Sequence, residues 1–289
     1  MNGSGREDLI KHSLWLFLIA VALIFILLWS LKGKMASFLS IDRSDVIQYQ
    51  VSDVTAENDG MHRIQEVLYH KEGIEASYPS ILSGDTADKL EDWNRIIKED
   101  FDRILQIYSF QPFPELTPGA DDGVPSLLLI SYDLKSNTEE WLSIIYYADY
   151  SSAYSAHPSN LIYTTNIDKR GSRRLRLSDI LDLNKDFVQE FRTWEWKGTS
   201  EESGEIKSAI YQYVENITDE ELLEGFRGAD QIGSGNPWGI YSYLTQNGLG
   251  ISLEVPHYAG DHAEFEQSFA RLEKYLKPEF ASLFAPISY

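Results

Sequence analysis

Histidine and aspartate residues that could bind a metal or move a proton gather near the end of the sequence. His257, Asp261 and His262 lie within the segment His-Tyr-Ala-Gly-Asp-His. Two imidazoles and a carboxylate suit a hard or borderline divalent metal, and a distant residue such as His157 could complete the set. The spacing matches no established zinc motif, so a polar loop after a strand is the competing interpretation. We expect no cofactor.

A run of tyrosines offers a second candidate site. Tyr147, Tyr150 and Tyr154 precede His157, and tyrosines provide contact area and hydroxyl donors for a sugar or peptide at low entropic cost. These four residues are therefore candidates for ligand binding. The competing interpretation is a strand whose tyrosines alternate between core and surface.

Motifs for other kinds of catalysis are missing from the sequence. Gly233-Ser234-Gly235 lacks the G-x-S-x-G frame of a serine nucleophile, and Gly225-Phe-Arg-Gly228 forms no phosphate-binding loop. The chain contains no cysteine, which excludes disulfides and thiol chemistry. Acid pairs suited to glycoside hydrolysis arise by chance among 45 acidic residues, so their abundance is no evidence for it. We predict no catalytic residues.

Hydrophobic periodicity predicts the elements that position these residues. A hairpin is expected over 62–80, an amphipathic helix over 86–108, and a second hairpin around Asn247-Gly248. The remaining predictions are a short strand at 46–51, strands at 126–134, 141–150, 161–167 and 174–177, and helices at 185–195, 203–216, from 218 and at 263–276. Strand clusters and helix clusters without βαβ spacing indicate an α+β fold with mostly antiparallel sheet and packed helices, preceded by one transmembrane helix.

The strongest single signal is an apolar run near the N-terminus. Residues 14–31 carry no charge and, at about 1.5 Å per residue, can cross a ~30 Å hydrocarbon core with their flanks. Trp15 and Trp29 lie near its ends, where indoles favour the headgroup level. The run exceeds the usual signal-peptide core and lacks a small-x-small cleavage site, so an uncleaved anchor is preferred to a cleaved signal.

These patterns divide the chain into a short cytoplasmic tail (1–12), a transmembrane anchor (13–34), a spacer (35–60) and an extracytoplasmic α+β domain (61–289). Lysines and arginines are nearly balanced on the two sides of the anchor. A short tail is easily left in the cytoplasm while a long domain is exported, so we expect a single-pass protein of the cell membrane. Its partner there is the lipid bilayer, through residues 13–34.

The charge balance limits the choice of partners. The formal net charge of -20 repels phosphate backbones, so nucleic acid is not an expected ligand. An acidic surface would attract a cationic protein. The competing interpretation is that the charge only keeps the domain soluble.

Several short sequence motifs follow one another in a particular order over most of residues 62–277. They are 74–81 with its Tyr-Pro pair, 92–97 with Asn94 and Ile97, 142–144 leading to 154–157, 166–171, 175–181, 243–249 and 265–276. In this order they resemble a bacterial extracytoplasmic domain family of unknown function. That family supplies the lysozyme-sensing ectodomain of an RsiV-type membrane anti-sigma factor and the non-catalytic N-terminal region of a PdaC-type peptidoglycan deacetylase.

The resemblance implies a binding module without an attached catalyst. The dozen residues before the anchor are too few to fold around a sigma factor, so we do not expect signalling by that route. The leading hypothesis is a membrane-anchored, extracytoplasmic ligand-binding or sensing domain at the cell envelope that binds a cationic protein such as lysozyme. The alternatives are a cell-envelope hydrolase acting on peptidoglycan or its sugars, and an architectural tether.

Overall fold

The computed structural model describes most of the chain after residue 61. The described residues are 50–52, 62–71, 73–109, 127–152, 157–198, 204–233, 235–236 and 238–284, and all of them belong to one compact unit, residues 47–289. The predicted tail (1–12), anchor (13–34) and nearly all of the predicted spacer (35–60) lie outside them. Within the described ranges, no helix combines the length and the apolar content that a membrane crossing requires.

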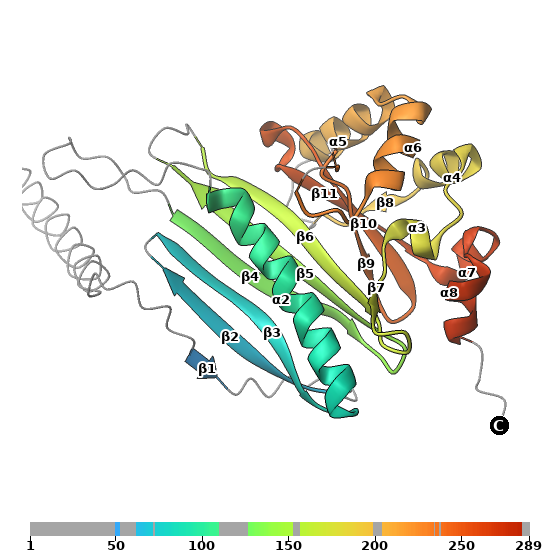
Figure 1. Ribbon diagram of the computed structural model, residues 1–289. Helices are drawn as coiled ribbons and strands as arrows, with labels where there is room; N and C mark the ends of the chain where they lie inside the picture. Colours follow the sequence, from blue (N-terminus) through green and yellow to red (C-terminus); the bar gives the residue numbers. More distant parts are fainter. Residues whose placement is uncertain are drawn as a thin grey trace, which may run out of the picture. The chain divides into compact units, whose positions relative to one another are not determined.

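Two β-sheets and several helices form this unit, which confirms the predicted α+β class with mostly antiparallel sheet (Figure 1). The larger sheet has seven strands in chain order: β1 (Gln50–Ser52), β2 (Arg63–Lys71), β3 (Ile74–Ser83), β4 (Leu127–Asn137), β5 (Trp141–Ser151), β6 (Ser159–Asp168) and β7 (Arg173–Arg174). All neighbours pair antiparallel except β3 and β4, which run parallel.

Turn chemistry fixes the hairpins of this sheet. Gly73, with a φ of 72°, turns β2 into β3 in a left-handed conformation that glycine adopts without steric cost. The β4–β5 turn instead depends on Thr138, whose hydroxyl accepts hydrogen bonds from the backbone N–H groups of Glu140 (3.2 Å) and Trp141 (3.1 Å). The predicted hairpin over 62–80 and the strands that follow are confirmed.

The helix α2 (Ala87–Ser109) lies across one face of the larger sheet (Figure 1). It connects β3 to β4, since parallel neighbours need a crossover. Its apolar side packs on the sheet with residues at most 4% exposed: Trp93, Ile96, Ile97, Phe101, Ile104 and Tyr108. The spacing of three and four residues that predicted this helix is therefore the spacing of its buried side.

Asn94 of α2 acts as a substitute strand partner. β3 pairs with β4 only over Ile74–Ala76, so its later residues need other partners on that side. The Asn94 side chain accepts from the Ile81 N–H (2.7 Å) and donates to the Ile81 carbonyl (2.8 Å), as a neighbouring strand would. This contact gives a physical reason for an asparagine at that position.

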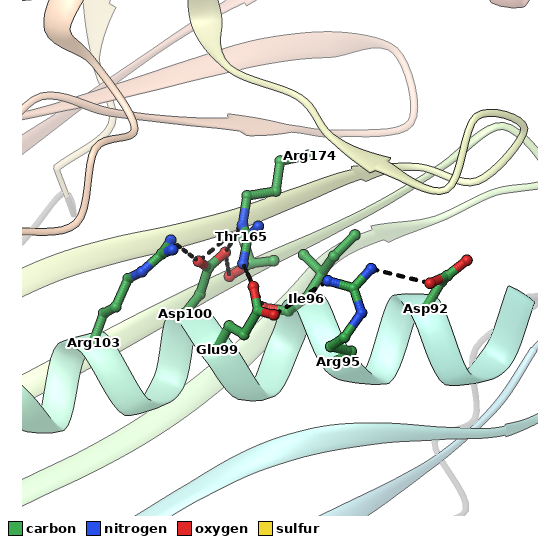
Figure 2. Close-up of polar contacts among 8 residues, drawn as sticks. All are labelled: Asp92, Arg95, Ile96, Glu99, Asp100, Arg103, Thr165 and Arg174. Carbon is green, nitrogen blue, oxygen red and sulfur yellow. Dashed lines mark hydrogen bonds and ion pairs between the residues drawn. The ribbon is translucent and has the colours of Figure 1, made fainter.

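An ion network ties α2 to the far edge of the sheet (Figure 2). The Arg174 guanidinium of β7 lies 3.0 Å from Asp100 and 2.7 Å from Glu99. Thr165 of β6 donates to the second Asp100 oxygen (3.1 Å). Burial raises the pKa of Asp100, with Arg174 acting in the opposite direction, and the hydrogen bond from Arg174 lowers the pKa of Glu99.

The smaller sheet forms a second core with its helices. Its strands run in the order β8 (Glu195–Trp196), β11 (His262–Ser268), β10 (Gly248–Glu254) and β9 (Tyr241–Leu244). The helices around it are α3 (Leu177–Ile180), α4 (Lys185–Phe191), α5 (Gly204–Asn216), α6 (Asp219–Gly228), α7 (Phe269–Leu272) and α8 (Pro278–Ala281). Single 3-10 turns lie at His257–Ala259, Glu273–Tyr275 and Ser282–Phe284. The helix predicted to begin at 218 is α6, with Thr218 in a capping box, and the predicted hairpin at Asn247-Gly248 is confirmed.

Three sequence-based boundaries are wrong. The expected helix over 263–276 is strand β11 followed by the short α7, because buried Ala263 and Phe265 alternate with polar residues and pair with β10. The strand expected at 174–177 ends at Arg174, and residues 177–180 are helical. The helix expected over 185–195 ends at Phe191, before β8 begins.

Buried polar contacts join the two sheets. The Asp230 carboxylate accepts from the Ser242 N–H (2.5 Å), the Ser242 hydroxyl (2.7 Å) and the Leu177 N–H (2.6 Å). Nearby, Asn166 of β6 donates to the Ser242 carbonyl (2.7 Å), and the Ser143 hydroxyl accepts from the Leu244 N–H (2.9 Å). Burial raises the pKa of Asp230 to about 6. Strand β9 is thereby fixed against β5 and β6.

Replacing Arg174 should test the ion network. Arg174→Met removes the guanidinium that contacts both oxygens of the 5%-exposed Asp100 carboxylate and leaves it only the half-exposed Arg103 (3.1 Å), so we expect the free energy of unfolding to fall by ~2 kcal/mol in urea titration. Arg95→Met is the matched control, since the exposed Arg95 pairs with Asp92 and Glu99 on the surface of the same helix and should contribute little. Equal stabilities for the two variants would contradict this account.

Candidate functional site

The connection between β10 and β11 carries three of the residues predicted to do chemistry. A 3-10 turn at His257–Ala259 is followed by two left-handed residues, Gly260 (φ 103°) and Asp261 (φ 68°). Aspartate is one of the few non-glycine residues that tolerate this conformation. The chain therefore reverses within a few residues, and the Val255 N–H closes the loop on the Asp261 carbonyl (2.9 Å).

The reversal places a carboxylate against an imidazole. Asp261 Oδ1 lies 2.9 Å from His257 Nδ1, and its side chain is 14% exposed, whereas that of His257 is 54% exposed. A carboxylate at Nδ1 fixes the ring orientation and leaves Nε2 as the ring nitrogen available to another partner.

Strand β6 anchors this pair through one residue. The Asn160 N–H donates to Asp261 Oδ2 (2.9 Å), and the Asn160 carbonyl lies 3.2 Å from His262 Nδ1. The side chains of Asp261 and His262 thus take the backbone groups of Asn160 as partners. Local sequence patterns do not point to Asn160, because it lies about a hundred residues before the loop that it holds.

The structure also brings His157 to the same place. Its ring stacks on that of His257 with centroids 4.9 Å apart and an interplanar angle of 18°. Tyr258, 71% exposed, directly follows His257 in the sequence. Burial, and then the Asp261 carboxylate, raise the pKa of Glu254 at the end of β10. The candidate site therefore combines accessible imidazole and phenol rings with at least two carboxyl groups.

The predicted metal ligands His257, Asp261 and His262 are held by hydrogen bonds in this structure. Among the residues that the structure describes, no three His, Asp or Glu side chains are arranged to hold a metal ion. The nearly parallel rings of His157 and His257 do not aim their nitrogens at a common point, as ligands of one metal must. Metal binding by His257, Asp261 and His262 stays a prediction.

The predicted tyrosine platform is split between two surfaces. Tyr150 faces α2, with its ring centroid 5.5 Å from that of Tyr108. Tyr147 points to the opposite face, where the Lys135 ammonium lies 5.9 Å from its ring. Successive strand residues alternate between faces, so residues three apart in β5 cannot share one surface. Tyr154 lies outside the described residues, and a binding role for each tyrosine separately stays a prediction.

A buried lysine is the most unusual polar group that sequence reasoning missed. Lys169, 2% exposed, follows β6 in the turn between β6 and β7. Its ammonium lies 2.9 Å from His62 Nδ1 and donates to the Asn137 side chain (2.6 Å) and the Thr138 carbonyl (2.5 Å). Burial lowers the pKa of Lys169 to about 8. Turn composition alone does not indicate burial, so no local signal could have identified it.

Comparisons with known proteins give no assignment of function. No known protein family and no curated protein matches the sequence. Similar solved structures include a member of the DUF3298 family from Bacteroides fragilis, which is 11% identical with a TM-score of 0.43 over 84% of this chain and 100% of that chain. A DUF3298 family protein from Pseudomonas aeruginosa is 12% identical with a TM-score of 0.41 over 83% of this chain and 97% of that chain. Both names denote a domain of unknown function, and TM-scores of this size transfer nothing to this chain.

Substitutions at Asp261 should show how the loop is held. Asp261→Ala removes the acceptor of the Asn160 N–H. It also places alanine at a positive φ, a conformation that alanine disfavours because it has a Cβ and no polar side chain. Amide exchange at Asn160 should therefore accelerate about tenfold or more. Asp261→Asn keeps an acceptor oxygen and tolerates the backbone, so exchange should change only a few-fold. Asp133→Ala, at an exposed position on β4, is the control. Unchanged Asn160 exchange in Asp261→Ala would show that the carboxylate does not hold the loop.

Proposed function

We propose that this chain is a ligand-binding or sensing domain, held at the outer face of a bacterial membrane by residues 13–34, whose ligand is a cationic protein. The apolar run at residues 14–31 supports the tether. The ordered segments that resemble the lysozyme-sensing ectodomain of an RsiV-type anti-sigma factor support a role in binding at the cell envelope.

The distribution of charge is the observation on which this proposal chiefly rests. Residues 1–46 carry five Lys or Arg and four Asp or Glu, so residues 47–289 carry 20 Lys or Arg and 41 Asp or Glu, a net charge of -21. Helices α5 and α6 carry part of this negative charge, because their exposed side chains include five glutamates and only two basic residues. Such a surface attracts cationic partners and accelerates their encounter.

Titration with lysozyme tests the proposal. The full chain in lipid nanodiscs should bind hen lysozyme at ~50 mM salt and lose at least tenfold in affinity at ~500 mM, because salt screens steering charges over a few ångströms. An acidic protein of similar size should not bind at either concentration. Absence of lysozyme binding at low salt would exclude lysozyme-like proteins as ligands.

A charge-matched pair of variants shows whether α5 and α6 take part. Combining Glu205→Gln, Glu215→Gln and Glu224→Gln removes three exposed charges from these helices. Combining Asp88→Asn, Glu91→Gln and Asp133→Asn removes three exposed charges elsewhere. We expect the first set to weaken lysozyme binding several-fold more than the second. Equal losses would indicate attraction by net charge without a docking surface on α5 and α6.

A cell-envelope hydrolase acting on peptidoglycan or its sugars is the second candidate, and the Asp261–His257 pair favours it. An exposed imidazole oriented by a carboxylate is a suitable general base. If this candidate is correct, release of dye-labelled peptidoglycan fragments should fall at least a hundredfold in His257→Ala. It should be unchanged in His70→Ala, at an exposed position on β2. No release by the unmodified protein, or equal release by His257→Ala, would end this candidate.

A further inference from the structure

Lys169 dictates the protonation state of His62. All three protons of an ammonium group are donors, and the acceptors around Lys169 Nζ are His62 Nδ1, the Asn137 side-chain oxygen and the Thr138 carbonyl, at 2.5 to 2.9 Å. His62 Nδ1 must therefore carry a lone pair. The ring is neutral, with its proton on Nε2.

The surroundings of His62 make a second positive charge, on its imidazole, energetically unfavourable. The residue is 7% exposed, and its Nε2 has no hydrogen-bond partner in the described structure. Its ring and the Trp93 ring form a T-shaped pair with centroids 5.2 Å apart and planes at 78°, and Lys169 Nζ lies 5.8 Å from the same indole. Protonation would place an imidazolium against the Lys169 ammonium in a buried site, which costs free energy through both desolvation and repulsion.

Nearby acids do not relieve this repulsion directly. Asp85, two residues before α2, lies 3.2 Å from Lys89 of that helix, and Glu140 of the β4–β5 turn lies 3.2 Å from Arg170. Asp85 favours the protonated form of His62, whereas Lys169 and Lys89 oppose it. Both neighbouring acids already have a cation at contact distance.

The direction of the pH effect follows from these contacts. Burial, and then Lys169, lower the pKa of His62 below its ordinary value of 6.5. The unfolded chain therefore binds a proton at His62 before the folded chain does, and the stability linked to His62 is present above about pH 6.5 and lost as the pH falls. Lys169 acts in a separate window: its pKa of about 8 lies below the ordinary 10.5, so its contribution to stability rises between those values.

His62 occupies a position where its release would affect the backbone. It immediately precedes β2, and its carbonyl accepts from the Asn137 side chain (3.2 Å), so it ties the start of this strand to the β4–β5 turn. We propose that His62 and Lys169 form an acid-sensitive switch, which holds the start of β2 at neutral pH and releases it when His62 is protonated. The switch requires no ligand, so its test is independent of the proposed binding function.

Hydrogen exchange of the full chain in nanodiscs, corrected for the intrinsic effect of pH, tests the switch. Protection of residues 63–68 should fall at least tenfold between pH 7.5 and 5.5 in the unmodified protein. His62→Asn keeps an oxygen acceptor near the Nδ1 position but cannot be protonated, so its protection should not change with pH. His70→Asn, at the exposed end of the same strand, should behave like the unmodified protein. An unchanged acid response in His62→Asn, or none in the unmodified protein, would overturn the proposal.

A measurement on the unmodified protein covers the case in which His62→Asn fails to fold. Long-range 15N–1H spectra of the His62 ring at pH 7.5 should show the neutral ring with its proton on Nε2. A ring that is charged at this pH, or that carries its proton on Nδ1, would overturn the proposal whatever the variants do.

Discussion

Asp230 lies where α6, α3 and β9 meet, and the rest of the fold depends on how its carboxylate is satisfied. It has no cation at contact distance in the described structure; its partners are the N–H and hydroxyl of Ser242, the N–H of Leu177 and the hydroxyl of Thr164 on β6 (3.4 Å). A left-handed backbone at Asp230 (φ 64°) turns the chain so that the side chain can reach them. Because an unpaired buried acceptor is costly, these bonds fix the smaller sheet against the larger one.

Strand β6 contributes residues both to the contacts between the sheets and to the two polar sites. Its middle contributes Asn166 to the contacts between the sheets and Thr165 to the ion network under α2. Near its start, Asn160 holds the Asp261–His257 pair, and directly after its end Lys169 meets His62. A single strand, fixed on both faces, thus positions a half-exposed imidazole at one end and a buried one at the other.

The elements that the sequence predicted correctly are those whose signal is local. Alternation identified the strands of the larger sheet, a spacing of three and four identified α2, and Asn247-Gly248 identified a hairpin. The helix predicted over 263–276 is wrong in part, because Phe265, Phe269 and Leu272 are spaced as in a helix although Phe265 belongs to strand β11. Pairing with β10 decided the outcome there, and pairing partners are not visible in a local pattern.

The sequence by itself determined the acidic charge, the class of fold, most of the elements and the residue types of the histidine and aspartate loop. Only the tertiary structure placed His157 on His257, gave Asp261 its partner in Asn160, separated Tyr147 from Tyr150 and buried Lys169 beside His62. The physical reason is that periodicity and turn chemistry act over a few residues. Hydrogen bonds between buried polar groups here join residues about a hundred positions apart, and their formation depends on how the two sheets pack.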